Sequence, residues 1–147
     1  AGMVGGQQDD LDSEGQDVDV QLIRRIHLGK TAALLAASLE AGAHLAKAPS
    51  SICRQIHHAG LNLGLAFQGA DDVLDVTATS EELGKTPGKD QAAGKATWVR
   101  VEGLEKARLR TSRYGKSGIK ELEEILPSGP KSERLLAMGS LMWNRNH

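Results

Sequence analysis

Three carboxylates, Asp71, Asp72 and Asp75, lie within five residues in the segment LAFQGADDVLDVT, which begins at Leu65. No lysine or arginine occurs between residues 55 and 84 to neutralise them. If this segment is helical, Asp71 and Asp75 are one turn apart and repel each other. Carboxylate oxygens and water are the ligands that Mg²⁺ prefers, commonly together with substrate phosphates. The spacing therefore predicts a magnesium and phosphate site, with a solvated acidic helix end as the alternative.

Lysines follow the carboxylates in a glycine-rich segment. Lys85, Lys89 and Lys95 occur in G-K-T-P-G-K-D and G-K-A-T. An ammonium group on a flexible side chain is a mobile point charge that suits phosphate oxygens. By itself the segment would be interpreted as a solvated lysine-rich loop. Next to the aspartates it indicates the other side of a diphosphate site, where metal and lysines share the charge of a departing diphosphate.

A lysine and a hydroxyl also occur together in an apolar segment, at Lys30 and Thr31. A lysine in such a place commonly extends to solvent along its methylene chain. The alternative is that Lys30 reaches the same phosphate as the later lysines, which would bring an early segment of the chain to the site.

The composition excludes several other classes of function. A formal charge of −1 gives no sign of a nucleic-acid surface. The longest apolar run, which begins at Thr31, is interrupted by Glu40 and His44 and is too short to span a membrane. The single cysteine, Cys53, excludes an internal disulfide and fits a reducing compartment. We therefore expect a cytoplasmic protein in which Cys53 is a small buried side chain.

Hydrophobic periodicity predicts an all-α protein of about five to six helices. Asp19 is a suitable N-cap for a long helix, and Gly115 and Gly118 are expected to weaken a later one. No alternating pattern of useful length indicates a strand. The expected helices cover the opening segment AGMVGGQQDDL and about residues 20–47, 51–76, 98–126 and 131–145, with a loop over about residues 79–97.

The expected helix over residues 51–76 carries two stripes at helical spacing. One is apolar and runs from Ile52 to Leu74. The other starts with two glycines, where a second backbone could approach closely, and ends in an amide and two acids. Its members are Gly60, Gly64, Gln68, Asp71 and Asp75. One helix thus combines a packing face with a separate polar face.

Six motifs occur in order along the chain: AGMVGGQ…DL…EG, RIHLGKTAALL, GLAFQGADDVLDVT, ELGKTPGKD, GKAT and GLEKAR. In this order they resemble the trans-isoprenyl diphosphate synthases, most of all the short-chain group that makes farnesyl or geranylgeranyl diphosphate. The resemblance covers nearly the whole chain, and the ending WNRNH is similar to the family's C-terminus. It implies a partial isoprenoid-synthase helical bundle around a deep cavity, and a homodimer in the complete protein.

The resemblance also implies a reaction. Members of this family are trans-prenyltransferases that condense an allylic diphosphate head-to-tail with isopentenyl diphosphate, the homoallylic substrate, using three Mg²⁺ ions per complete active site. By motif, Asp71 corresponds to the principal metal ligand of the second aspartate-rich motif. Asp72 and Asp75 would support it directly or through water.

The remaining site residues are carried over in the same way. Lys30, Lys85 and Lys95 correspond to the lysines that hold the allylic diphosphate. Thr31 and Gln68 correspond to the residues beside the reacting carbon, so the catalytic set implied by the resemblance is Lys30, Thr31 and Gln68. Oxygen dipoles next to a carbocation in a dry cavity are physically sensible.

The chain departs from the family pattern because it contains only the second of two aspartate-rich motifs. Asp9, Asp10 and Asp12 are no substitute, since they follow the GGQ segment, which resembles a stretch downstream of the first motif. The homoallylic-diphosphate site and the region that fixes product length are also missing, and Gly29 stands where histidine is frequent. We interpret residues 1–147 as the C-terminal half of one polyprenyl synthase domain whose N-terminal half is absent, and expect the isolated chain to be inactive.

Two other interpretations stay open at this point. One is a non-catalytic partner subunit of a full-length prenyl diphosphate synthase, and the other is a generic acidic metal-binding helical protein. His57 and His58 point to different faces of a helix, so a shared metal is not expected. Trp98 and Trp143 give no functional signal.

Overall fold

The computed structural model describes residues 2–77 and 94–144, which form eight helical elements and no strand. The predicted all-α class is therefore confirmed. Counting α2, η1 and α3 as one continuous rod gives six helices in the described residues, within the predicted number. The elements are α1 (Met3–Asp12), α2 (Val20–His27), η1 (Leu28–Ala32), α3 (Ala33–Leu45), α4 (Ser50–Thr77), α7 (Trp98–Glu102), α8 (Leu104–Ile125) and α9 (Pro130–Trp143).

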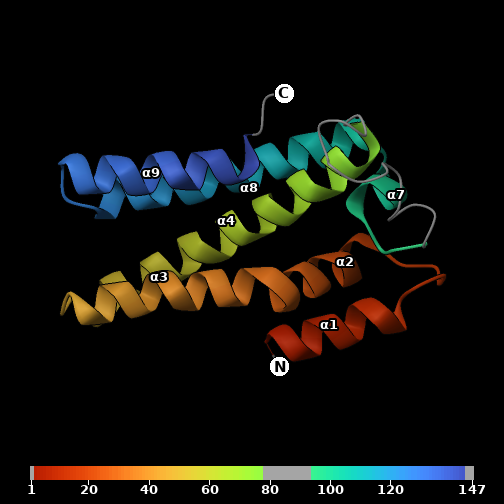
Figure 1. Cartoon of the computed structure of the whole chain (residues 1–147), viewed down its shortest axis with the longest axis horizontal. Coiled ribbons are helices and arrows are strands. Elements are labelled where there is room, and N and C mark those ends of the chain that lie inside the picture. Colours follow the sequence, from red (N-terminus) through yellow and green to blue (C-terminus); the bar gives the residue numbers. More distant parts are fainter. Residues whose placement is uncertain (1, 78–93, 145–147) are drawn as a thin grey trace.

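The long helix α4 crosses the middle of the molecule (Figure 1). An antiparallel pair, α8 and α9, lies on one side of it, and the rod formed by α2, η1 and α3 lies on the other. Helix α1 is at the outer edge beside α2, and the short α7 is near the end of α4. The two faces of α4 are therefore covered by different parts of the chain.

The rod begins where the sequence predicts. Asp19 is the N-cap of α2, and its side chain accepts a hydrogen bond of 2.7 Å from the Leu22 backbone N–H. Leu28 and Ala33, at the two ends of η1, keep right-handed helical dihedrals, so the axis continues into α3 without a break.

Small residues let the rod approach α4 backbone to backbone. A Cβ built on Gly60 would lie 2.6 Å from Ala36 Cα, and one on Gly64 would collide with Ala32 Cα. The prediction that these two glycines admit a second backbone is confirmed. The same stripe of α4 continues to Gln68, so the close contact brings the rod to the polar end of the helix.

The helix expected over residues 98–126 is broken at a different place from the one predicted. Gly103 has a φ of 84°, a left-handed value that suits glycine, and separates α7 from α8. Gly115 and Gly118 lie inside α8 and do not interrupt it. They are small because a Cβ on Gly115 would collide with the indole of Trp143, and one on Gly118 would lie 2.8 Å from Leu63 Cγ. The expected weakening there is wrong.

In the part of the chain that the structure describes, the core consists of two apolar clusters. One surrounds Leu65 and Trp98 at the α7 end, and the other surrounds Leu63 and Leu122 between α4, α8 and α9. Cys53 belongs to the second cluster and is 1% exposed, as expected. Leu63 and Leu65 are both supplied by α4, so this helix connects the two clusters.

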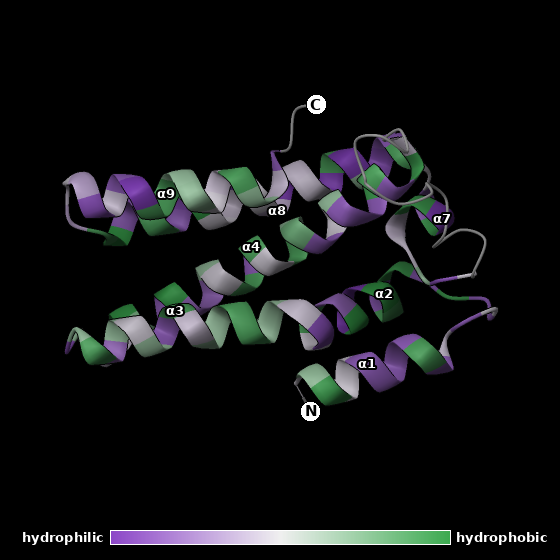
Figure 2. Cartoon of the chain, in the orientation of Figure 1, coloured by the Kyte–Doolittle hydropathy of each residue, from purple (hydrophilic) through white to green (hydrophobic). Residues whose placement is uncertain are grey.

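Apolar side chains also remain on the outside. Val4 in α1 and Leu34 in α3 are 77% and 60% exposed, and apolar residues appear along the outer edge of α1 near its start (Figure 2). Among the described residues, no helix combines the length and hydropathy needed to cross a membrane.

Candidate functional site

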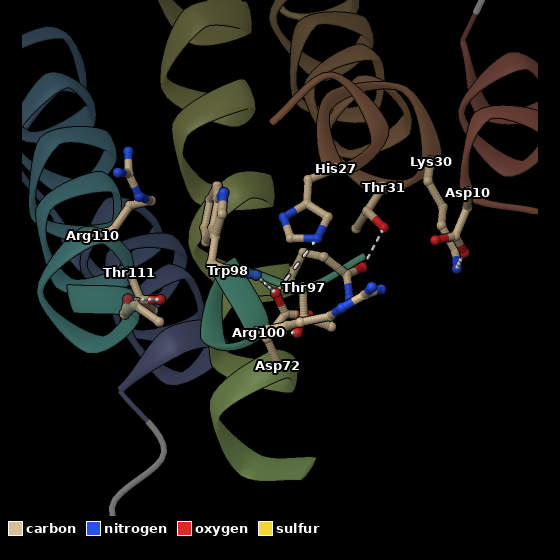
Figure 3. A network of polar contacts seen from close by, with 12 residues as sticks. Asp10, His27, Lys30, Thr31, Asp72, Thr97, Trp98, Arg100, Arg110 and Thr111 are labelled. Atoms are coloured by element: carbon tan, nitrogen blue, oxygen red, sulfur yellow. Dashed lines mark hydrogen bonds and ion pairs between the residues drawn. The ribbon is translucent and has the colours of Figure 1, made fainter. Parts of the chain in front are cut away.

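The rod contains a π-helical turn at Leu28–Ala32, and Lys30 and Thr31 lie on it. A π-turn widens the helix locally and redirects side chains, and such turns are frequent at functional sites. Lys30 extends toward α1, whereas Thr31 points toward α4 (Figure 3). Two neighbouring polar residues thereby reach two different helices.

Lys30 is paired with an acid in α1. Its Nζ lies 2.6 Å from Asp10 Oδ2, and the Asp10 side chain is only 8% exposed. The helices come this close because Gly6 faces Gly29, and a Cβ on Gly6 would collide with the backbone there. The Lys30 side chain is 30% exposed and ends in this ion pair, which is neither of the two outcomes expected for it, and its contact with a phosphate stays a prediction. Its charge is held at the surface of the α1 and η1 contact.

Thr31 and Gln68 meet across the interface between η1 and α4. Thr31 Oγ1 donates a hydrogen bond of 2.9 Å to Gln68 Oε1. The two residues are 37 positions apart in the sequence, and the family resemblance assigned both to the surroundings of one reacting carbon. The structure brings them into direct contact, one helical turn before the aspartates.

The three aspartates of α4 do not converge on one point. Asp71 is half-buried, whereas Asp72 and Asp75 are 4% and 3% exposed. Asp72 Oδ2 accepts the Trp98 backbone N–H at 3.1 Å and lies 3.6 Å from His27 Nε2. Within residues 2–77 and 94–144, no three His, Cys, Asp or Glu side chains form a group that could hold a metal ion.

This donor set fits one side of a metal and diphosphate complex. Mg²⁺ is usually bound through one or two carboxylates and completes its coordination with water and substrate phosphates. Asp71, whose side chain remains partly exposed to solvent, can provide such a carboxylate, and Lys30 lies on the neighbouring rod. A complete metal cage made by protein alone is not what these residues form.

His27 is a buried neutral imidazole beside Asp72. Burial, and to a lesser degree the charge of Lys30, lowers its pKa to about 3. Its ring packs edge-on against Trp98 with the centroids 4.7 Å apart. His27 Nδ1 has no hydrogen-bond partner among the described residues. The imidazole therefore gives Asp72 a polar neighbour and no positive charge.

Trp98 anchors α7 between α4 and α8. It is 0% exposed and stacks on Tyr114 at 5.7 Å between centroids, and the Arg110 guanidinium lies 5.6 Å from its ring. Gly69 of α4 makes room, because a Cβ there would lie 2.7 Å from Trp98 Cζ3. Arg110 also donates two hydrogen bonds of 2.6 and 2.7 Å to Glu102, which raise the pKa of Arg110. Trp98 thus has a clear structural role that its sequence context did not signal.

Lys95 precedes this anchor. The guanidinium of Arg100 donates to the Gly94 carbonyl at 2.6 Å and to the Gln16 carbonyl at 3.0 Å. The backbone next to Lys95 is therefore tied to the connection between α1 and α2. Lys85, the other lysine predicted in this region, lies outside the described residues.

A cavity of about 390 Å³ adjoins the aspartates on the α7 side. It combines two buried carboxylates with one guanidinium. Its lining residues are Asp72, Asp75, Val76, Thr97, Val99, Arg100 and Leu104.

Sequence reasoning missed Asp10 and His27, although their spacing carried a signal. Asp10 is four residues after Gly6, so on a helix the acid follows the small residue on one face. Gly29 directly precedes Lys30, and the two glycines could have been matched as a helix crossing. His27 follows Ile23 by four residues on the apolar face of α2, and both are buried.

The described residues form an all-α chain in which a hydroxyl and an amide meet one turn before the aspartates of the central helix α4. Residues 1–132 match the family described as "Polyprenyl synthetase", and the chain belongs to that family. The resemblance found in the sequence is thus confirmed.

Relatives and a solved structure agree with this assignment. Over 148 residues the chain is 40% identical to a dimethylallyltranstransferase from Fischerella ambigua, covering 100% of the chain and 42% of that protein. It is 38% identical to the heterodimeric geranylgeranyl pyrophosphate synthase large subunit 2 of Arabidopsis thaliana, covering 99% and 39%. A geranyltransferase from Helicobacter pylori, complexed with magnesium and isoprenyl diphosphate, matches with a TM-score of 0.79 and 30% identity, over 93% of this chain and 46% of that one. The chain spans less than half the length of each of these proteins.

Proposed function

We propose that this chain forms one face of the active site of a Mg²⁺-dependent trans-prenyltransferase and binds a magnesium and diphosphate complex. Asp71 is the principal metal ligand, and Asp72 and Asp75 support it from the same end of α4. The observation that carries the proposal is the Thr31 to Gln68 hydrogen bond of 2.9 Å. It supports a shared site because it joins the π-turn with Lys30 to the helix that carries the aspartates.

Each side chain has a task in this proposal. Lys30, Lys85 and Lys95 bind oxygens of the allylic diphosphate as point charges, and Lys30 exchanges its ion pair with Asp10 for the diphosphate when the ligand binds. Thr31 Oγ1 and Gln68 Oε1 direct oxygen dipoles at the carbon that becomes cationic when its bond to the diphosphate breaks. Magnesium, when bound, supplies the charge neutralisation that this bond cleavage requires.

The parent reaction is the head-to-tail condensation of isopentenyl diphosphate with an allylic diphosphate, giving farnesyl or geranylgeranyl diphosphate. The C–O bond of the allylic substrate breaks with its electron pair leaving on diphosphate. The homoallylic double bond then attacks the carbocation, and the proton is lost to the released diphosphate. In the complete protein we expect a homodimer with three Mg²⁺ ions in each site.

The isolated chain should bind without catalysing this condensation. Its 147 residues contain one D-D-x-x-D sequence, so the carboxylates of the opposing side are not available from this chain. Incubation with geranyl diphosphate, isopentenyl diphosphate and Mg²⁺ should give no longer prenyl diphosphate above the background of a heat-treated sample. Measurable product would contradict this part of the proposal.

Calorimetric titration with inorganic pyrophosphate, with and without Mg²⁺, tests the binding proposal. Binding should require Mg²⁺, and Asp71→Asn and Lys30→Ala should each weaken it by about tenfold or more, since a charged hydrogen bond contributes about 1.5–3 kcal/mol. Lys120→Ala is the matched control, because Lys120 is 76% exposed on α8 and pairs with Glu124. Binding that is unaffected by Mg²⁺, or by both site substitutions, would contradict the proposal.

A second candidate function is a non-catalytic subunit that associates with a full-length synthase. It is favoured by the exposed apolar side chains of α1 and α3, such as Val4 and Leu34, and by the likeness to a relative named as a subunit of a heterodimer. Co-purification of a tagged chain with a complete prenyl diphosphate synthase, and a change in that enzyme's product length, would support this function over the first.

We place the protein in the cytoplasm, on the ground that its one cysteine, Cys53, is buried and unpaired with another cysteine. Imaging of the fluorescently tagged protein tests this, and accumulation in an organelle would contradict it.

A further inference from the structure

Adjacent acids on α4 differ in their surroundings. Asp71 is half-buried, whereas Asp72 is 4% exposed and directs Oδ2 at the start of α7 (Figure 3). There it accepts the Trp98 backbone N–H at 3.1 Å in a fully buried hydrogen bond. The first N–H groups of a helix have no acceptor within that helix. A carboxylate from α4 therefore satisfies a donor that α7 cannot satisfy by itself.

The Trp98 residue is held a second time through its side chain. The indole fills the space over Gly69 and packs between His27 and Tyr114. Backbone and side chain of one residue are thus both fixed to α4. Movement of the start of α7 would break a buried hydrogen bond and expose a large aromatic surface at the same time.

Lys95 is separated from this anchor by only two residues. Ala96 is 3% exposed, and the Thr97 side chain accepts the Arg100 backbone N–H at 3.2 Å. Three steps of fully extended chain span at most about 11 Å, so the Lys95 backbone must stay near Trp98. On its other side, the Gly94 carbonyl is held by Arg100 at 2.6 Å. The lysine segment therefore runs between two fixed points.

We propose that Asp72 is a positioning residue, which fixes the Lys95 segment relative to the helix that carries Asp71. Its Oδ2 holds the Trp98 N–H, and the anchored backbone sets where the Lys95 side chain starts. The ligand in this inference rests on the proposed function, because the ammonium group and Asp71 are taken to face one diphosphate. The anchoring itself does not depend on any ligand.

Hydrogen exchange of the ligand-free chain tests the anchor directly. Asp72→Ala should speed exchange of the backbone amides at 98–102 by about tenfold or more, because the buried hydrogen bond of the Trp98 amide is lost and with it the support that holds the start of α7. Asp72→Asn, which keeps an oxygen acceptor, should restore protection to within about threefold of wild type. Asp71→Ala is the matched control, since it removes the same charge one position earlier and should leave these amides protected.

Several outcomes would overturn the anchor. They are unchanged exchange in Asp72→Ala, equal loss of protection in Asp72→Asn, or equal loss in Asp71→Ala. If Asp72→Ala does not fold, Asp72→Glu replaces it. This variant keeps the charge but displaces the oxygen by a methylene group, so it should speed exchange where Asp72→Asn does not.

Titration with Mg²⁺ and inorganic pyrophosphate tests the link to Lys95. Asp72→Ala and Lys95→Ala should weaken pyrophosphate binding by similar factors. The double variant should bind no more weakly than the weaker single variant, because both changes remove the same contribution, that of the Lys95 ammonium group. Factors that multiply in the double variant would refute the link. Failure of the wild-type chain to bind pyrophosphate would refute the proposed function instead, and the exchange experiment would still decide whether Asp72 anchors α7.

Discussion

Two of the contacts that helix α4 makes are of opposite character. Against the rod it presents Gly64, which meets the backbone of Ala32 with almost no side chain between the helices. Against α7 it presents Gly69 and Asp72, which receive a fully buried indole and a backbone N–H from Trp98. The first contact is steric and extends along the helices, whereas the second depends on a few specific groups at one point. Thr31 and Gln68, for which we propose a role in the chemistry, belong to the first contact, and Asp72, for which we propose a positioning role, belongs to the second.

The aromatic contact should be the more costly to remove. Replacing Trp98 by alanine should lower the free energy of unfolding by about 4 kcal/mol, since truncation of a buried aromatic side chain leaves a large cavity. Urea unfolding followed by circular dichroism measures this. Leu109→Ala is the control, because Leu109 is 71% exposed on α8 and should change stability by less than about 0.5 kcal/mol. A loss below about 1 kcal/mol for Trp98→Ala would mean that α7 does not depend on the indole.

The contact between the rod and α4 should be destabilised nearly as much, in this case by adding a side chain and not by removing one. Gly64→Val should cost about 2–3 kcal/mol, because the added carbon meets the Ala32 backbone, which cannot rotate away. Gly42→Ala is the matched control on α3, where an added Cβ meets nothing within 4 Å. That control should gain up to about 1 kcal/mol from helix propensity. Similar stability changes for the two variants would show that the rod and α4 are not closely packed.

Lowering the pH should destabilise the folded chain through His27, which packs against Trp98 of α7. Its pKa is about 3 in the folded chain, against an ordinary value of 6.5 that applies once the chain unfolds. Between these two values the unfolded chain binds a proton that the folded chain does not. The free energy of unfolding attributable to His27 should therefore fall by about 1.4 kcal/mol for each pH unit from pH 6.5 down toward 3. His27→Phe should lose this part of the pH dependence.

Unfolding of the wild type and of His27→Phe, measured from pH 7.5 to 4.5, gives the comparison. The carboxylates titrate in both proteins, so the difference between the two curves isolates the imidazole. Leu109→Ala should run parallel to the wild type over the same range. Parallel curves for His27→Phe and the wild type would contradict the buried neutral imidazole.

The two contacts also differ in how far the sequence predicts them. The rod contact follows from spacing, because Gly60 and Gly64 are one turn apart and their role is local sterics. The α7 contact does not, because it joins Asp72 to the backbone of a residue 26 positions later, and no periodic pattern encodes such a distance. The motifs identify Lys95 and Asp72 by type, but the hydrogen bond from the Trp98 N–H to Asp72, on which the proposed positioning role rests, is visible only in the tertiary packing.

The π-turn is a similar case. Its five residues, Leu28–Ala32, lie in a run whose periodicity predicts a plain α-helix, and the structure confirms the helix while changing its local winding. The ion pair between Lys30 and Asp10 is formed from this turn, next to the crossing of Gly6 with Gly29. A pattern of apolar spacing encodes neither the π-turn nor the helix crossing. The sequence therefore predicts Lys30 as a site residue but does not predict its ion pair with Asp10.

The polar end of the steric contact should show the smallest effect. Thr31→Val keeps the shape of the side chain but removes the donor to Gln68 Oε1, and should cost about 1 kcal/mol, the usual net value of one hydrogen bond. Thr31→Ser keeps the donor and loses a methyl group, so it separates the hydrogen bond from packing. In a double-mutant cycle with Gln68→Leu, Thr31→Val should show a coupling energy of about 1 kcal/mol. The same cycle with Thr31→Ser should show less than half of that coupling energy, because serine keeps the donor. If Thr31 and Gln68 show no coupling energy, their hydrogen bond does not hold the π-turn against α4. The observation that carries the proposed function would then be lost.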